Sequence, residues 1–119
     1  MGRPVAWFEV VSTDAPRAQR FYGELFDWKV DADPALGGYG VVDTGAGDDA
    51  IGGGIGPSQA PGDTGVKFYV GVDDLDAYLA RATRLGGTTI LPPTELPGGT
   101  LGRIAVFADP DGNAVGLWA

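Results

Sequence analysis

The chemistry open to this chain rests on carboxylates, lysines, arginines and tyrosines, because the sequence contains no histidine and no cysteine. A Ser-His-Asp triad, a histidine general base, a thiol nucleophile and any metal site that needs His or Cys are therefore excluded. Glu9, beside Trp7 in an apolar run, is the candidate general base. Lys67 and Tyr69 occupy a second apolar run and are candidates for stabilising negative charge or contacting a ligand.

The overall charge excludes other classes of partner. Sixteen acidic residues against eight basic ones give a formal net charge of −8, and the isoelectric point is about 4.1. Nucleic acids and anionic membranes both require a basic face, so we expect neither as a partner. Residues 1–20 lack the apolar core of a signal peptide, which favours a cytoplasmic protein.

The elements that would position these residues begin with a strand over 5–11, rich in β-branched and aromatic residues. Residues 12–14 then offer N-cap oxygens, and Pro16 suits the first turn of a helix. The helix has one apolar face at spacings i, i+3, i+4 and i+7, and residues 28–30 return to a strand. That face consists of Ala18, Phe21, Tyr22 and Leu25.

The same order recurs about sixty residues later. Residues 66–70 are a predicted strand, Asp73 and Asp74 cap a helix, and Gly86-Gly87 suit a left-handed C-terminal cap. Strands at 88–91, 103–107 and 114–118 follow, the last two joined by a Pro-Asp-Gly-Asn turn. The repeated order predicts two βαβββ modules.

Glycine marks the junction between the modules. Eleven of the 21 glycines lie between Gly37 and Gly65, a composition typical of turns and a linker. We therefore expect one domain over 1–119, with a module at about 4–56, a linker at 57–63 and a module at about 64–119. The run Gly52–Gly56 is not a phosphate-binding loop, because it lacks the Gly-Lys-Ser/Thr ending and leads into Pro57.

The motifs at both ends of this repeat resemble one known family. Trp7–Val10 with Phe21–Trp28, and Phe68–Asp74 with Phe107–Asn113, are similar to the vicinal oxygen chelate superfamily of glyoxalase I, extradiol dioxygenases and bleomycin-resistance proteins. The resemblance implies an α+β fold in which two tandem βαβββ modules form a cupped mixed sheet with helices on the outer face. It also implies a homodimer.

The resemblance further implies a divalent metal in the cup, but the matching positions do not supply its ligands. They carry Gly65 and Gly116 in the second module, Gly52 in the first, and Val5 or Trp7 on the first strand. Only Glu9 remains as a ligand, whereas a catalytic metal usually needs about three protein ligands. We therefore expect no metal and no other cofactor.

Strand alternation predicts what lines the cup instead. If Phe8 and Phe68 face the helices, Trp7, Glu9, Lys67 and Tyr69 face the cup. The same parity adds Gly52, Gly54, Gly116 and Trp118, and we extend the face to Arg103, Ala105 and Phe107. Aromatic walls over a floor of small residues favour a flat organic ligand. The predicted ligand-binding residues are Trp7, Glu9, Lys67, Tyr69, Arg103, Phe107 and Trp118.

Three functions remain open. The first is a metal-free protein that binds or sequesters a small hydrophobic or aromatic metabolite. The second is an enzyme: a metal-free isomerase, epimerase or cyclase with Glu9 as general base, or a metal-dependent lyase or dioxygenase. The third is a protein-interaction domain, for which the sequence has no positive feature.

Overall fold

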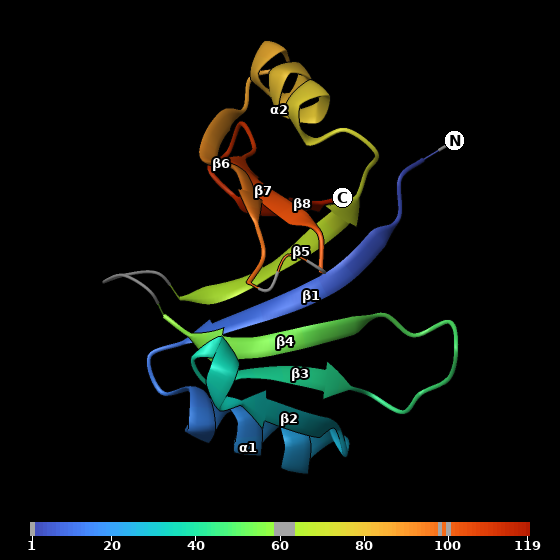
Figure 1. Cartoon of the computed structure of the whole chain (residues 1–119), viewed down its shortest axis with the longest axis vertical. Helices are drawn as coiled ribbons and strands as arrows, with labels where there is room; N and C mark the ends of the chain where they lie inside the picture. Colours follow the sequence, from blue (N-terminus) through green and yellow to red (C-terminus); the bar gives the residue numbers. More distant parts are fainter. Residues whose placement is uncertain (1, 59–63, 98, 100) are drawn as a thin grey trace. The chain divides into compact units, whose positions relative to one another are not determined.

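The computed structural model describes residues 2–58, 64–97, 99 and 101–119 (Figure 1). The chain divides into two compact units. We call Trp7–Val66 the N-terminal module, and Lys67–Ala119 together with residues 2–6 the C-terminal module. The division falls a few residues beyond the expected linker 57–63, of which 59–63 lie outside the described residues.

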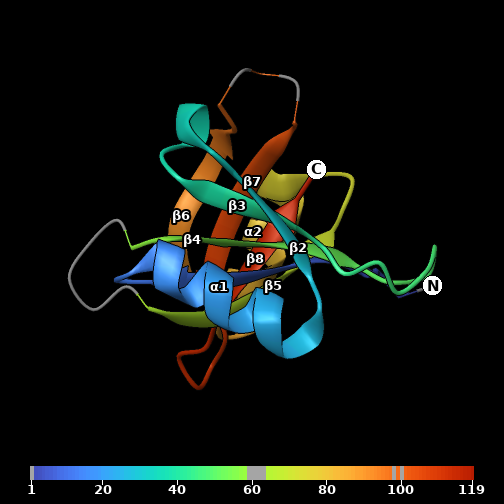
Figure 2. The same cartoon turned by 90° about the horizontal axis from the view of Figure 1, so that it is seen from below.

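The N-terminal module is a four-stranded mixed sheet with one α-helix. Its strands run in the order β2-β3-β4-β1, with β1 parallel to β4 and β3 antiparallel to both of its neighbours. Helix α1 covers one face of this sheet (Figure 2). The elements are β1 (Val5–Ser12), α1 (Ala15–Phe26), β2 (Lys29–Asp33), the 3-10 helix η1 (Pro34–Leu36), β3 (Tyr39–Asp43) and β4 (Gly52–Pro57).

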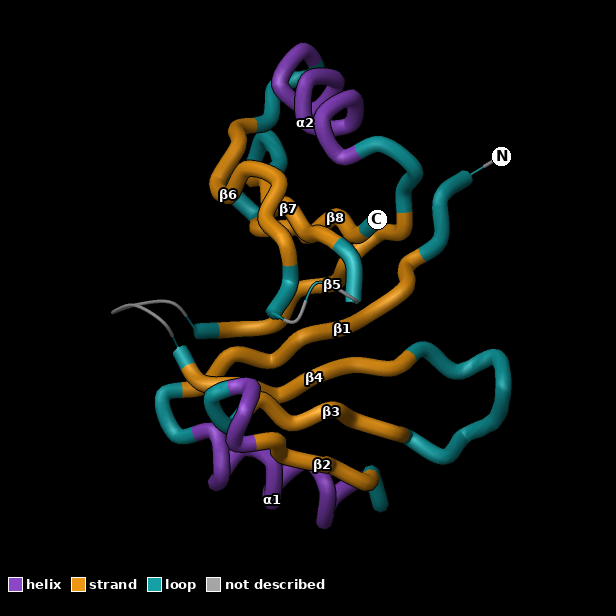
Figure 3. The backbone as a smooth tube through the Cα atoms, in the orientation of Figure 1, coloured by secondary structure: helices purple, strands orange, loops and turns teal. Residues whose placement is uncertain are grey.

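The C-terminal module repeats this arrangement. Its strand order is β5-β8-β7-β6, with β5 parallel to β8 and the other pairs antiparallel. Both modules therefore have the predicted βαβββ order, which the tube in Figure 3 displays. The elements are β5 (Gly65–Gly71), α2 (Leu75–Arg84), β6 (Thr88–Glu95), β7 (Arg103–Ala108) and β8 (Ala114–Trp118).

The predicted helix caps are confirmed. The Asp14 carboxylate accepts a hydrogen bond from the Arg17 amide at 3.2 Å, and the Asp74 carboxylate accepts one from the Ala77 amide at 3.0 Å. Each bond satisfies an amide that has no partner inside its helix. Gly86 follows α2 with φ +106°, the left-handed conformation expected there.

The two helices bury different shares of their apolar faces. In the C-terminal module, Leu75 and Leu79 of α2 are buried against Ala105 and Leu117 of the sheet. In the N-terminal module, Phe21 is 58% exposed and Leu25 is 57% exposed, so the predicted apolar face of α1 is only partly buried. Within the described residues, no helix has both the length and the apolar character that a bilayer span requires.

Candidate functional site

A strip of glycines in β4 forms the floor of the candidate site. Side chains alternate along a strand, so Gly52, Gly54 and Gly56 share one face of the N-terminal sheet. The opposite face is the one covered by α1, since a Cβ at Gly53 would meet the Phe8 ring, which packs against Trp28 at a centroid distance of 5.3 Å. Residues that rest on the strip therefore lie away from the helix.

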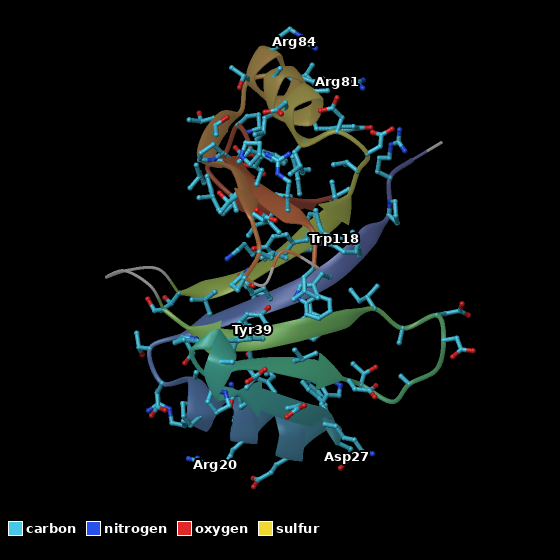
Figure 4. The ribbon with its side chains drawn as sticks, in the orientation of Figure 1. Arg20, Asp27, Tyr39, Arg81, Arg84 and Trp118 are labelled. Carbon is cyan, nitrogen blue, oxygen red and sulfur yellow. The ribbon has the colours of Figure 1, made fainter. Side chains whose placement is uncertain are left out.

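Two aromatic rings rest directly on this strip. Trp7 pairs with Gly52 in the parallel β1–β4 register, and a Cβ at Gly52 would lie 3.0 Å from the indole ring. Tyr39, labelled in Figure 4, covers the other two glycines. A Cβ at Gly54 would overlap its hydroxyl and ring, and one at Gly56 would lie 2.5 Å from a ring carbon. The glycines thus make room for the protein's own rings rather than leaving a hollow, which corrects the expectation of an open small-residue floor.

A chain of hydrogen bonds links these rings to the Glu9 carboxylate. The Trp7 indole N–H donates to the Tyr39 hydroxyl at 3.1 Å, and that hydroxyl donates to Glu9 Oε2 at 2.9 Å. All three side chains are half-buried. We call Trp7, Glu9 and Tyr39 the aromatic wall. The indole hydrogen and the phenolic hydrogen are both used within it, so neither ring has a polar hydrogen left to donate to a ligand.

Helix α1 holds the backbone beneath the aromatic wall. The Gln19 side-chain amide donates to the Gly38 carbonyl at 3.0 Å and to the Ile55 carbonyl at 2.9 Å. Gly38 immediately precedes Tyr39, and Ile55 separates the two glycines that Tyr39 covers. The Gln19 side chain, on the opposite face of the sheet, therefore fixes the backbone next to Tyr39 and the backbone of the strand that Tyr39 covers.

Tyr39 is the member of the wall that the sequence analysis missed. It is the first residue of β3, in the glycine-rich stretch, where the sequence analysis assigned it no role. One signal was present in the sequence. The alternation Gly52-x-Gly54-x-Gly56 in a strand requires large partners on the same face, and the aromatic residue between Gly38 and Gly40 is a nearby source.

The C-terminal module carries a comparable pair. Tyr69 pairs with Gly116 in the β5–β8 register, a Cβ at Gly116 would overlap the tyrosine ring, and Tyr69 is only 6% exposed. Lys67 has the same parity on β5 and is half-buried. Trp118, labelled in Figure 4, is 43% exposed, and its indole N–H donates to the Leu101 carbonyl at 2.9 Å.

The expected face is wrong for Arg103, Ala105 and Phe107. Phe107 packs against the buried cluster that includes Leu79 and Ala105, which lies between the sheet and α2. Arg103 has the same parity on β7, and its side chain is exposed. Because β7 and β8 pair without a register shift, the residues of β7 that share the face of Gly116 are Ile104 and Val106 instead.

The described residues do not bring together the set of ligands that a catalytic metal usually needs. Among the described residues, no group of three or more Asp or Glu side chains converges on a common point. The positions that would carry ligands by resemblance include Gly52 and Gly116, each beneath an aromatic ring that a longer side chain would strike. Glu9 is the remaining oxygen ligand, and its carboxylate accepts the Tyr39 hydroxyl. A lone carboxylate is too few ligands for a stable divalent site.

Comparisons with known proteins agree with this architecture. The chain is 33% identical over 116 residues to "Putative glyoxylase CFP32" of Mycobacterium bovis, covering 94% of this chain and 44% of that protein. It is 35% identical over 130 residues to "Anthracycline biosynthesis protein DnrV" of Streptomyces peucetius, covering 95% of this chain and 46% of that protein. The chain therefore spans less than half the length of these curated relatives.

A solved structure shares the fold. A glyoxalase/bleomycin resistance protein/dioxygenase superfamily member from Vibrio splendidus 12B01 superimposes with a TM-score of 0.65 at 17% identity, covering 98% of this chain and 97% of that one. The sequence profile of the Glyoxalase-like domain matches residues 7–117, nearly the whole chain. The chain is a member of the Glyoxalase-like domain family, as the paired motifs predicted.

Proposed function

We propose that this protein binds a small planar aromatic ligand on the aromatic wall without the help of a metal. The observation that carries the proposal is the Trp7–Tyr39–Glu9 hydrogen-bond chain laid over the β4 glycine strip. Rings fixed by hydrogen bonds and by contact with the backbone lose little entropy when a ligand stacks on them. The donors of both rings are used internally, so recognition of the ligand by the wall depends mainly on the faces of the rings.

The relative named for anthracycline biosynthesis supports the same class of ligand. Anthracyclines are flat, fused-ring compounds, which are suited to stacking on indole and phenol rings. The first probe is therefore daunorubicin, tested by isothermal titration calorimetry on the chelator-treated protein. Binding should be saturable, and Trp7→Ala should weaken it by about 1–3 kcal/mol.

A matched control separates the site from non-specific stacking. Trp28 lies on the α1 side of the same sheet, where it packs with Phe8. Trp28→Phe should bind daunorubicin as the unmodified protein does. If it weakens binding as much as Trp7→Ala does, or if no member of a set of planar aromatic compounds binds, the proposal is wrong.

Independence from metals is tested separately. The chelator-treated protein is heated with Mn²⁺, Fe²⁺, Ni²⁺ or Zn²⁺, and we expect no rise in the unfolding temperature. An ion present at a hundredfold excess over its dissociation constant would stabilise the fold by about 2.7 kcal/mol. A stoichiometric stabilisation would contradict the proposal and favour a metal-dependent lyase or dioxygenase.

The position of Glu9 supports a second candidate, a metal-free isomerase, epimerase or cyclase. One carboxylate oxygen is fixed by the Tyr39 hydroxyl at 2.9 Å, which would orient the carboxylate as a general base beside a stacked substrate. Turnover separates the two candidates, because Glu9→Gln should retain most of the affinity for the aromatic probe in either case. A binding protein should leave its ligand chemically unchanged, whereas an enzyme should convert its substrate and lose that turnover in Glu9→Gln.

We also propose that the protein forms a homodimer, as its resemblance to the family implies. One feature supports association of this kind: several large apolar side chains of α1 are more than half exposed.

A further inference from the structure

The outer surface of α1 combines exposed apolar side chains with an unusual order of charges. Arg17, Phe21, Glu24 and Leu25 follow one another at i, i+4, i+7 and i+8, so they share one face of the helix. Phe21 is 58% exposed and Leu25 is 57% exposed, while Ala15 on the opposite side is buried. We call these four residues the α1 outer face.

The charges of α1 oppose the dipole of their own helix. Acidic side chains stabilise a helix near its N-terminus and basic ones near its C-terminus. Apart from the Asp14 carboxylate at its N-cap, which suits the dipole, helix α1 has the reverse order: Arg17 and Arg20 lie in its first half, Glu24 lies in its second half, and its first turn contains no acidic residue. Figure 4 shows Arg20 and Asp27 toward opposite ends of this helix.

Helix α2 of the same chain provides an internal comparison. It has Asp76 in its first turn and Arg81 and Arg84 in its last turn, the order that its dipole favours. The reversed order of charges is thus specific to α1 and does not occur in α2. It lowers the stability of the isolated helix slightly. Among the described residues, the ion pair that α1 makes is the exposed Arg17–Asp14 pair at 3.8 Å.

A second α1 placed antiparallel makes this charge order favourable. The midpoint between Arg17 and Glu24 lies next to Phe21, so a twofold axis near Phe21 sets Arg17 of each copy opposite Glu24 of the other. The same axis brings Phe21 against its own copy and sets Leu25 opposite Pro16 of the other copy. A face that pairs with itself in this way is what a closed twofold dimer requires, and a parallel pairing would set like charges together.

We propose that the α1 outer face is a dimerisation surface on which a second copy of this chain docks with its α1 antiparallel. The proposal rests on the homodimer proposed above and identifies its surface. It is independent of the aromatic wall, because Trp7, Glu9 and Tyr39 lie on the other face of the N-terminal sheet from the one that α1 covers.

Charge reversal tests the pairing without removing the helix. Sedimentation velocity over a range of concentrations gives the dimer dissociation constant for a chain of 12.2 kDa. Arg17→Glu and Glu24→Arg each create like-charge contacts across the interface, so each should weaken the dimer by about tenfold at low salt. Each change also restores the charge order that the α1 dipole favours, so the unfolding temperature at low protein concentration should stay equal or rise.

Mixing the two single variants gives the decisive result. A chain with Arg17→Glu and a chain with Glu24→Arg place opposite charges at both contacts, so the mixture should form a heterodimer more tightly than either variant pairs with itself. The double variant in one chain should dimerise as the unmodified protein does.

Apolar variants supply the control. Phe21→Ser should dissociate the dimer, whereas Leu101→Ser, at a position 54% exposed in the C-terminal module, should not. A dimer that is insensitive to both charge reversals and to Phe21→Ser would overturn the assignment of the surface while leaving the homodimer intact. A chain that is monomeric at every concentration would overturn both, and neither result bears on daunorubicin binding, which is measured on the same variants.

Discussion

Gly54→Ala should destabilise the protein strongly for such a small change, because the Tyr39 ring occupies the space of the new methyl group. A Cβ at position 54 would overlap the tyrosine hydroxyl and the adjoining ring carbons. That end of the side chain is held by its hydrogen bonds to Trp7 and Glu9. Overpacking costs about 1–3 kcal/mol, and loss of two hydrogen bonds at about 0.5–1.5 kcal/mol each adds a similar amount. The expected loss is about 2–6 kcal/mol of unfolding free energy.

The measurement is urea unfolding followed by circular dichroism, with Gly71→Ala as the matched control. Gly71 is also a strand glycine, but a Cβ there would lie 3.7 Å from the Ala6 side chain, an ordinary contact. Its replacement should change the unfolding free energy by no more than about 1 kcal/mol. The reasoning is refuted if Gly54→Ala is as stable as Gly71→Ala while the Trp7 indole N–H keeps its chemical shift, since the ring would then not be resting on Gly54.

Three smaller predictions concern the frame around the site. Leu79→Ala, at a position only 7% exposed in the core, should lower the unfolding free energy by about 2–5 kcal/mol, whereas the exposed Leu25→Ala should change it by about 0.5 kcal/mol or less in urea unfolding of the monomer. Asp74→Ala should cost about 1 kcal/mol through loss of the α2 cap, and Asp74→Asn should recover most of it in the same assay. The Asn113 side-chain amide and backbone amides lower the pKa of Asp109, so its contribution to stability is present above the usual carboxyl pKa and is lost as the pH falls through the lowered value. The difference in stability between the unmodified protein and Asp109→Ala should therefore shrink on acidification, and a difference that grows instead would contradict that sign.

The order of elements was predictable because local signals are strong in this sequence. Asp14 and Asp74 each stand before an apolar run at helical spacing, and both cap a helix in the structure. Gly86 has the positive φ that its place after α2 predicts. These features depend on neighbours within a few residues, which is the range over which a sequence determines structure directly.

The wrong or missing assignments concern side chains whose surroundings are set by residues far away in the sequence. Phe107 was assigned to the open face from strand parity alone, but the β7–β8 register and the packing of α2 place it beneath the helix. Tyr39 was overlooked because its contacts are with β4, a different strand, and the alternating glycines of β4 do not indicate which side chain covers them. Its role depends on glycines fifteen residues or more along the chain. Phe21 and Leu25 belong to the apolar face of α1 that the helical spacing predicts. The packing of α1 against the sheet leaves both of them exposed, and this packing cannot be predicted from the spacing.

The most direct test of metal-free aromatic binding follows the three tryptophan indole N–H signals in a ¹⁵N spectrum. Daunorubicin is titrated into the chelator-treated protein, and the signals are assigned with Trp7→Phe and Trp28→Phe. The account predicts saturable movement of the Trp7 signal, with the Trp28 signal unchanged, because only Trp7 lies on the face of the aromatic wall. Movement that requires an added divalent metal, or that affects Trp28 and not Trp7, would contradict it.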